Sequence, residues 1–347
     1  MSHTLALSFA DGKTLFLSAR PGELLLDAAR RQGVNLPMDC REGVCGTCRG
    51  RCESGRYRQD YVDEEALTPL ELRERMVLAC QTRVDSDAAF YFDFASAQCT
   101  AAGGEVRQAV VTGLEQVSDG TAVLHLAAEG APLRFLPGQY ARLRVPGTDQ
   151  WRAYSFANLP NPENQLQFLI RLLPDGVMGH FLRETCRPGM PVELEAPFGS
   201  FYLRQVERPL VMVAGGTGLS AFLGMLEGMA GEGGCGQPVR LYYGVNREQD
   251  LCEIARLEAC RAQIPDFDYR IVVSTPGAGW QGPAGFIPAH FDEGFLARGP
   301  FDMYLCGPPP MVDAVKAWLA PRALPEHRLY AEKFLHSHPR PQAQGAG

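Results

Sequence analysis

Four cysteines in the first third of the chain are spaced as ligands of an iron–sulfur cluster. Cys40, Cys45 and Cys48 follow the pattern C-x4-C-x2-C, and Cys80 lies further along the chain. Two irons bridged by two sulfides need four thiolates that converge on a small volume, and one loop can supply three of them. The pattern therefore predicts a [2Fe–2S] cluster held by these four residues.

Zinc is the alternative metal for such a group of thiolates. Structural zinc sites usually combine two short C-x2-C units, whereas here only Cys45 and Cys48 form one. Gly43 and Gly46 would let the loop backbone approach the sulfurs without a Cβ in the way. Cys52 falls outside the pattern, and we expect it to be a packed thiol. The spacing thus favours the iron–sulfur interpretation.

Two glycine-rich segments in the last third could bind the phosphates of a dinucleotide. PLVMVAGGTGLSAF (209–222) has the pattern of a buried strand, a turn and a helix start, and YLCGPPPMV (304–312) follows a later strand. Backbone N–H groups in such turns bind phosphate. The spacing is not the G-x-G-x-x-G of dehydrogenases, so the prediction depends on this context. The residues expected at the site are Gly215, Gly216, Thr217, Gly218, Cys306, Gly307 and Pro308.

The composition is that of an ordinary globular protein of 347 residues, 46% hydrophobic and 21% charged. A net charge of −7 without a basic block argues against a nucleic-acid partner. The N-terminal segment lacks the features of a signal peptide, and no apolar run approaches the length of a membrane span. We therefore expect a cytoplasmic protein, in which structural disulfides are rare. The 11 cysteines then favour metal binding for the clustered ones and simple burial for the others.

Hydrophobic periodicity divides the chain into three blocks that must position these residues. Residues 1–97 contain alternating strand patterns and one helical stretch. Residues 105–205 contain short β-like runs separated by turn signals, which is typical of an antiparallel barrel. Residues 206–335 alternate buried strands and helices, which predicts a parallel α/β sheet. We expect a linker at 98–104 and a disordered tail at 336–347.

The first block resembles a plant-type ferredoxin domain. The resemblance rests on CREGVCGTC and MVLACQT, which surround the four cysteines. It implies an α+β fold of the β-grasp type. Clusters of this kind have potentials of roughly −400 mV, which suits the delivery of single electrons.

The second block resembles the flavin-binding barrel of the ferredoxin–NADP⁺ reductase superfamily. The matching segments are WRAYSF (151–156), PDGVMGHFL (174–182) and APFGSFYL (196–203). The resemblance implies bound FAD, with a helix start in the second segment directed at the pyrophosphate.

Individual flavin contacts follow from this resemblance. Arg152 would pair with a flavin phosphate, Tyr154 would lie against the isoalloxazine ring, and Ser155 would bond near the flavin N5. The further contacts that the resemblance implies are those of Arg171, Met178, Gly179 and Phe334. The superfamily commonly has serine at the position of Gly179, so we expect a slightly weaker hold on FAD than a Gly179→Ser variant would show.

The nicotinamide site is expected where the two glycine-rich loops meet the flavin. By the same resemblance, Cys306 and Glu332, together with Ser155, are the candidate catalytic residues. An isolated cysteine such as Cys306 is more often a buried small hydrophobe, but its C-G-P-P-P-M context favours a role beside the nicotinamide. Both Arg247 and Asp250 follow a predicted strand, so the motif alone does not choose between NADPH and NADH. The resemblance of the whole chain favours NADH.

The order of the three blocks resembles the reductase components of multicomponent aromatic-ring oxygenases, in particular the electron-transfer components of benzoate, toluate and anthranilate 1,2-dioxygenases. It implies that a hydride passes from NADH to FAD, and that single electrons then pass through the cluster to a terminal Rieske oxygenase. No general acid–base pair or nucleophile is needed for this chemistry.

Two alternatives remain at this point. The reductase of a di-iron phenol or methane monooxygenase shares all three blocks. A ferredoxin-like carrier fused to a regulatory module would bind no flavin. A further hypothesis concerns docking of the oxygenase, in which Arg41, Arg49 and Arg51 around the cysteine loop would steer the partner electrostatically.

Overall fold

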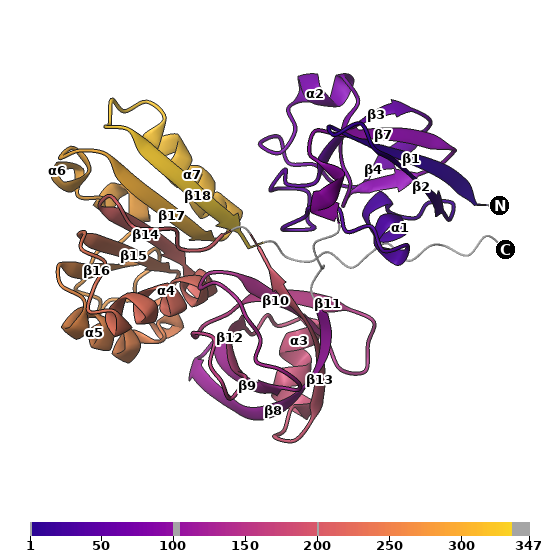
Figure 1. Ribbon diagram of the computed structural model, residues 1–347. Coiled ribbons are helices and arrows are strands. Elements are labelled where there is room, and N and C mark those ends of the chain that lie inside the picture. Colours follow the sequence, from indigo (N-terminus) through magenta and orange to yellow (C-terminus); the bar gives the residue numbers. More distant parts are fainter. Residues whose placement is uncertain (1, 100–104, 200, 335–347) are drawn as a thin grey trace. The chain divides into compact units, whose positions relative to one another are not determined.

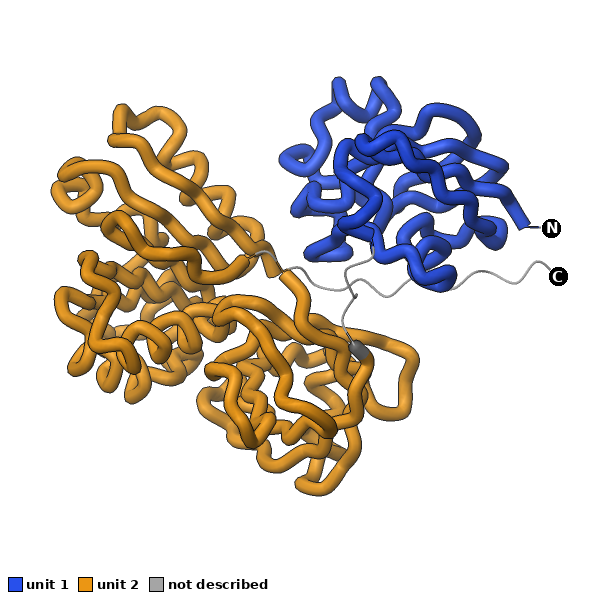
Figure 2. The backbone as a smooth tube through the Cα atoms, viewed as in Figure 1, with its two compact units in different colours: residues 1–104 blue, residues 105–347 orange. Residues whose placement is uncertain are grey.

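The described part of the chain forms two compact units. The computed structural model covers residues 2–99, 105–199 and 201–334 (Figure 1). The chain divides into residues 1–104 and residues 105–347 (Figure 2). Each unit has its own hydrophobic core.

Two segments expected to be irregular lie largely outside the described residues. Of the linker expected at 98–104, only residues 98 and 99 are described, and they end a short 3-10 turn, η1 (Ser96–Cys99). The tail expected at 336–347 lies wholly outside the described residues. In the ranges that are described, no helix is long and apolar enough to cross a membrane.

The first unit is an α+β fold around a five-stranded mixed sheet, as predicted. The strand order is β2-β1-β7-β3-β5, with β1 and β7 parallel and the other neighbours antiparallel. Strands β4 and β6 form a separate two-stranded sheet. The strands are β1 (His3–Phe9), β2 (Thr14–Ala19), β3 (Arg49–Ser54), β4 (Tyr57–Gln59), β5 (Met76–Leu78), β6 (Thr82–Val84) and β7 (Ala88–Phe92).

The described part of the first unit has two α-helices, of which only the first was predictable from the sequence. Helix α1 (Leu25–Arg31) buries its apolar face and ends two residues before Gly33, whose φ is +78°. Helix α2 (Pro69–Arg73) buries no residue and begins at a capping box formed by Thr68 and Glu71. Because α2 buries none of its residues, hydrophobic periodicity did not predict a helix there.

The second unit begins with an antiparallel sheet of six strands in the order β11-β10-β13-β8-β9-β12. An antiparallel bridge between Phe156 and Phe168 links the two edges, which closes the sheet into the predicted barrel. Helix α3 (Val177–His180) continues into a π-helical turn, η2 (Phe181–Thr185). The strands are β8 (Glu105–Ser118), β9 (Thr121–Ala128), β10 (Tyr140–Arg144), β11 (Trp151–Ser155), β12 (Gln165–Arg171) and β13 (Pro191–Phe198).

The remainder of this unit is a five-stranded sheet in the order β16-β15-β14-β17-β18, and all neighbours are parallel. This confirms the predicted α/β architecture. The strands are β14 (Leu210–Gly215), β15 (Val239–Val245), β16 (Phe267–Val273), β17 (Phe301–Gly307) and β18 (His327–Lys333). The α-helices are α4 (Leu219–Gly231), α5 (Ile254–Gln263), α6 (Glu293–Leu296) and α7 (Pro309–Leu319), and the 3-10 turns are η3 (Gly216–Gly218), η4 (Glu248–Asp250) and η5 (Ile287–His290).

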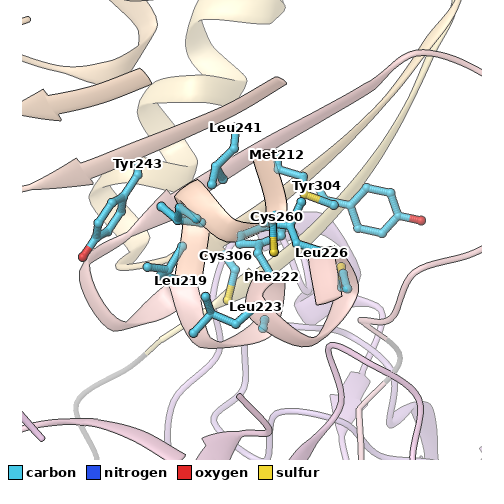
Figure 3. Close-up of a cluster of buried hydrophobic side chains, with 14 of the residues drawn as sticks. Met212, Leu219, Phe222, Leu223, Leu226, Leu241, Tyr243, Cys260, Tyr304 and Cys306 are labelled. Carbon is cyan, nitrogen blue, oxygen red and sulfur yellow. The ribbon is translucent and has the colours of Figure 1, made fainter. Parts of the chain in front are cut away.

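Helices cover both faces of the parallel sheet. Alternate residues of each central strand point to opposite faces, so Met212 packs with α4 and α5 while Val213 packs with α6 and α7. Figure 3 shows the first of these clusters, in which Phe222 and Leu223 of α4 surround Cys306 of β17. The sheet core thus fixes the position of Cys306 from several sides.

Candidate functional site

The four predicted cluster cysteines come from two segments of the first unit. Cys40, Cys45 and Cys48 lie in the loop between α1 and β3, and Cys80 lies in the turn between β5 and β6. The backbone N–H of Cys40 donates to Cys45 Sγ, and that of Glu42 donates to Cys40 Sγ, each over 3.4 Å. Bonds of this type stabilise thiolate sulfur, so the loop backbone fits a thiolate-bound cluster.

The electrostatics of these cysteines group them into two pairs. A side-chain hydrogen bond with Cys45 and burial raise the pKa of Cys40, and the same bond lowers the pKa of Cys45 to about 6. Contact with Cys48 and burial likewise raise the pKa of Cys80. Among the described residues, no three His, Cys, Asp or Glu side chains gather as ligands of one metal ion. The four predicted ligands therefore lie as two neighbouring pairs of thiols.

Two glycines shape the cysteine loop. Gly43 has a φ of +79°, and a Cβ there would collide with the carbonyl oxygen of Tyr61. Gly46 has a φ of +69°, which also disfavours any other residue. Gly43 is therefore required by the close approach of Tyr61, whereas Gly46 is favoured by its φ.

Cys52 lies apart from this loop, on β3. Its side chain is 1% exposed, accepts a hydrogen bond from the Arg75 guanidinium over 3.0 Å, and donates to the Ser54 carbonyl over 3.2 Å. The thiol is thus packed and hydrogen-bonded, in keeping with the expectation that it is not a ligand.

The three arginines proposed to steer docking are already engaged by acidic residues. The Arg41 guanidinium lies 3.7 Å from Asp27, and that of Arg51 lies 2.9 Å from Glu53. Arg49 forms an ion pair with Glu71 at the exposed helix α2. Their charge is therefore partly compensated within the unit, which weakens the steering hypothesis.

The predicted flavin residues of the R-x-Y-S motif lie together on β11. Ser155 is 2% exposed, whereas Tyr154 is half-buried, and burial raises the pKa of its hydroxyl. The half-buried Arg152 guanidinium donates to the Trp151 carbonyl over 3.0 Å and contacts Gln150. The motif thus presents an arginine, a tyrosine ring and a buried hydroxyl along one strand.

The remaining barrel candidates differ in their exposure. Arg171 is exposed at the end of β12, and Met178 is 3% exposed in α3. A Cβ on Gly179 would lie 2.9 Å from the Leu173 carbonyl oxygen, closer than real Cβ contacts come. A serine there would therefore require the helix start or the Leu173 carbonyl to shift, a cost that any added phosphate contact would have to offset.

The two glycine-rich loops of the parallel sheet pack directly on each other at its carboxyl edge. A Cβ on Gly218 would collide with the Cys306 carbonyl oxygen. A Cβ on Gly215 would lie 2.6 Å from Met311 Sδ and 2.8 Å from Pro308 Cδ. Gly307 is held by its carbonyl, which accepts from the Phe334 N–H over 2.8 Å. Close packing thus favours glycine at Gly215 and, through backbone approach, requires it at Gly218, at the edge where such sheets bind ligands.

The three candidate catalytic residues meet at this edge. Cys306 and Glu332 are register partners on β17 and β18, and Ser155 comes from the barrel. Ser155 Oγ donates to Glu332 Oε2 over 3.3 Å, and Cys306 Sγ lies 3.8 Å from the same oxygen. Burial and the nearby Glu332 carboxylate raise the pKa of Cys306 well above its ordinary value, so its sulfur is a neutral thiol.

The neighbourhood of this cluster includes the predicted contact Phe334 and one residue that the sequence did not single out, Arg256. The half-buried Phe334 packs against the α4 side of the sheet core. Arg256 of α5 bonds both to α4 and to the barrel segment after Ser155. Glu253 lies three residues before Arg256 in the sequence. This spacing of opposite charges was the only local feature that could have pointed to Arg256.

The residues considered for choosing NADH or NADPH form a local turn. The backbone N–H of Arg247 donates to the Asp250 carboxylate over 3.0 Å, which caps η4. Arg247 is exposed and Asp250 is half-buried. Both therefore remain near the carboxyl end of β15, where the sequence placed them.

Three family models cover most of the chain. The 2Fe-2S iron-sulfur cluster binding domain matches residues 8–85, the oxidoreductase FAD-binding domain matches residues 108–202, and the oxidoreductase NAD-binding domain matches residues 212–317. These matches confirm the predicted cofactor set. They also oppose the alternative of a ferredoxin-like carrier without a flavin.

Characterised relatives match along the whole chain. The anthranilate 1,2-dioxygenase electron transfer component of Acinetobacter baylyi is 59% identical, over 97% of this chain and 98% of the relative. The toluate 1,2-dioxygenase electron transfer component of Pseudomonas putida is 43% identical over 97% of this chain and 100% of the relative. The phenol 2-monooxygenase reductase of Pseudomonas sp. (strain CF600), which represents the monooxygenase alternative, is 33% identical over 95% and 93%.

A solved reductase structure has a similar architecture along nearly the whole chain. The Amycolatopsis cytochrome P450 reductase GcoB is 31% identical, with a TM-score of 0.74 over 95% of this chain and 99% of that chain. The described fold, the three family models and the identities to dioxygenase components all agree. The chain belongs to the family of flavin and iron–sulfur electron transfer components of aromatic-acid 1,2-dioxygenases.

Proposed function

We propose that the chain carries electrons from NADH to the Rieske terminal oxygenase of an anthranilate-type 1,2-dioxygenase. The observation that supports this reaction best is the meeting of Ser155, Cys306 and Glu332, which brings the barrel and the parallel sheet to one point. The 59% identity to an anthranilate dioxygenase component, against 43% and 33% for the toluate and phenol systems, supports the aromatic-acid partner.

In this proposal, residues 1–97 hold the cluster through Cys40, Cys45, Cys48 and Cys80. The N–H···S bonds of the loop and the pairing of the thiols support this assignment. A plant-type cluster near −400 mV passes electrons downhill to a Rieske centre, whose potential is roughly −150 to +300 mV.

Residues 105–205 bind FAD, which when bound accepts a hydride and releases its electrons one at a time. Arg152 supplies a bidentate cation for a phosphate, and Tyr154 supplies a ring surface beside the buried Ser155 hydroxyl. The other contacts that we propose are those of Arg171, Met178, Gly179 and Phe334.

Residues 206–335 bind the dinucleotide through the backbone of their two tightly packed loops. The phosphate-binding residues in this proposal are Gly215, Gly216, Thr217 and Gly218, and those beside the nicotinamide are Cys306, Gly307 and Pro308. Cys306 stays a neutral thiol, and the Ser155 hydroxyl donates a hydrogen bond to the Glu332 carboxylate. The half-buried Asp250 offers an acceptor for the ribose hydroxyl of NADH.

The cytoplasmic location of the protein also stays a prediction.

The partner assignment is tested by electron delivery to purified oxygenases. The NADH-reduced protein is mixed with the oxygenase of an anthranilate dioxygenase or with the hydroxylase of a phenol monooxygenase, and hydroxylated product is measured. We expect turnover that depends on this protein with the first partner and at least a tenfold lower rate with the second. Equal rates, or a preference for the phenol system, would contradict the proposed partner.

A further inference from the structure

One arginine joins the parallel-sheet domain to the barrel beside the proposed hydride-transfer site. Arg256 lies in the first turn of α5, and its side chain is 24% exposed. Its Nε donates to Glu227 of α4 over 2.8 Å, and its Nη1 donates to Glu253 over 3.0 Å. Its Nη2 donates to the backbone carbonyl of Ala157 in the barrel. The same Nη2 also donates to Glu227, so two carboxylates hold the guanidinium that binds the barrel.

The barrel segment that Arg256 binds is firmly tied to its neighbours. The N–H of Ala157 donates to the Gln167 carbonyl over 2.8 Å, and the N–H of Phe156 donates to the Gln139 carbonyl over 3.0 Å. The buried Asn158 side chain accepts from the Gln167 N–H over 2.8 Å. Ser155 directly precedes this segment, so a displacement of Ala157 would be passed to the Ser155 hydroxyl.

Helix α4 packs closely against the same segment. A Cβ on Gly224 would lie 3.1 Å from the Asn158 carbonyl oxygen, and one on Gly228 would lie 3.5 Å from the Leu159 side chain. The N-terminal end of α4 is the Gly216–Gly218 turn proposed to bind the dinucleotide. The helix thus connects that turn to the barrel, and Arg256 supplies a charged contact at this junction.

Glu253 is held in an unusual conformation beside Arg256. Its φ is +59°, a left-handed value that residues other than glycine rarely adopt. Its carboxylate accepts from the Arg256 side chain, and its carbonyl accepts from the Arg256 N–H over 3.1 Å. Strained residues of this kind persist where the surrounding contacts determine them, often near functional sites.

We propose that Arg256 is a positioning residue for hydride transfer. By fixing Ala157 relative to α4 and α5, it sets how closely the barrel residue Ser155 approaches Cys306 and Glu332 of the parallel sheet. It acts through the backbone of the barrel and not on the cofactors themselves. This inference rests on the proposed function of the site.

The test compares Arg256→Met with Arg256→Lys and with the matched control Arg261→Met. Arg261 lies on the same helix and pairs with Glu258 and Asp268, both within the parallel-sheet domain.

Flavin reduction by NADH is followed by rapid mixing in the holoprotein. We expect Arg256→Met to slow it roughly tenfold to a hundredfold, because small misplacements of reacting groups have effects of this size. NADH affinity should stay within about twofold, Arg256→Lys should recover part of the rate, and the control should match wild type.

A second readout needs no cofactor turnover. Amide hydrogen exchange of segment 155–159 in the apo-protein should rise in Arg256→Met and stay unchanged in Arg261→Met, because only the first loses a contact to this backbone. If Arg256→Met does not fold, Glu227→Gln can replace it, because it weakens the hold of Glu227 on the Arg256 guanidinium. This variant should also slow flavin reduction and raise amide exchange of segment 155–159.

The outcomes separate this inference from the proposed function. A wild-type flavin that NADH does not reduce would overturn the proposed function, and the role of Arg256 with it. Normal reduction in wild type with an unchanged rate in Arg256→Met would overturn the positioning role alone. A slow variant whose whole defect is weaker NADH binding would also overturn it.

Discussion

At the residue scale, one carboxylate organises the candidate catalytic group. Ser155 Oγ and Cys306 Sγ both face Glu332 Oε2, at 3.3 and 3.8 Å. The hydroxyl and the neutral thiol are both donors, so the carboxylate accepts from two groups that belong to different domains of the second unit. Loss of the Glu332 charge would replace the carboxylate that both donors share with a weaker neutral acceptor, and this makes Glu332 the most informative position for mutation.

The cluster ligands can be tested one residue at a time. Cys80→Ser should prevent assembly of the cluster, because a hydroxyl is a far poorer ligand for iron than a thiolate. Cys52→Ser should keep full iron and sulfide content, since serine can still accept from Arg75 and donate to the Ser54 carbonyl. Iron and sulfide analysis with visible absorbance measures both. A cluster that survives in Cys80→Ser, or is lost in Cys52→Ser, would refute the ligand assignment.

Single residues were predictable from the sequence only where their spacing or context was distinctive. The cysteine spacing indicated the cluster ligands directly, and the motif resemblance indicated Ser155, Cys306 and Glu332. The contact between Ser155 and Glu332 was not predictable from local pattern, because 177 residues separate them. Arg256 could not be predicted because one of its partners is the backbone carbonyl of Ala157, which has no side-chain signature.

At the element scale, strands with strong alternation and buried helices were predictable, and elements without an apolar face were not. The parallel strands β14, β15 and β17 are almost wholly buried, and their continuous apolar runs predicted them. Helix α2 buries nothing and depends on its capping box, and β18 alternates weakly. Helix α3 has only four residues before its π-helical turn, so its geometry depends on the Leu173 backbone next to it.

This geometry gives a prediction for the start of α3. Gly179→Ser should weaken FAD binding several-fold, because the new Cβ must push away from the Leu173 carbonyl before any hydroxyl can reach a phosphate. Titration of apo-protein with FAD measures the dissociation constant. Gly231→Ser, at a position on α4 with open space around it, serves as the control and should leave FAD binding unchanged. Tighter FAD binding by Gly179→Ser would contradict this prediction, because it would show that the helix start shifts at little cost in free energy.

At the scale of the whole molecule, the chain joins three domains whose cofactors transfer electrons either in pairs or singly. The barrel and the parallel sheet form one unit whose domains meet at Ser155, Cys306 and Glu332, and the cluster domain forms the other unit. Hydrophobic periodicity indicated the barrel and the parallel sheet, whereas the fold of the cluster domain followed from its resemblance to plant-type ferredoxins. The central claim is that electrons enter at the Glu332 site and leave at the cluster.

Rapid mixing of the holoprotein with NADH tests this claim most directly, because flavin and cluster absorbance can be followed separately. In wild type and in the control Glu326→Gln, whose side chain is 70% exposed and pairs with Arg208, we predict loss of flavin absorbance followed by loss of cluster absorbance. In Glu332→Gln, both changes should be slowed roughly tenfold to a hundredfold, because the shared acceptor loses its charge. Cluster reduction as fast in Glu332→Gln as in wild type would contradict the account.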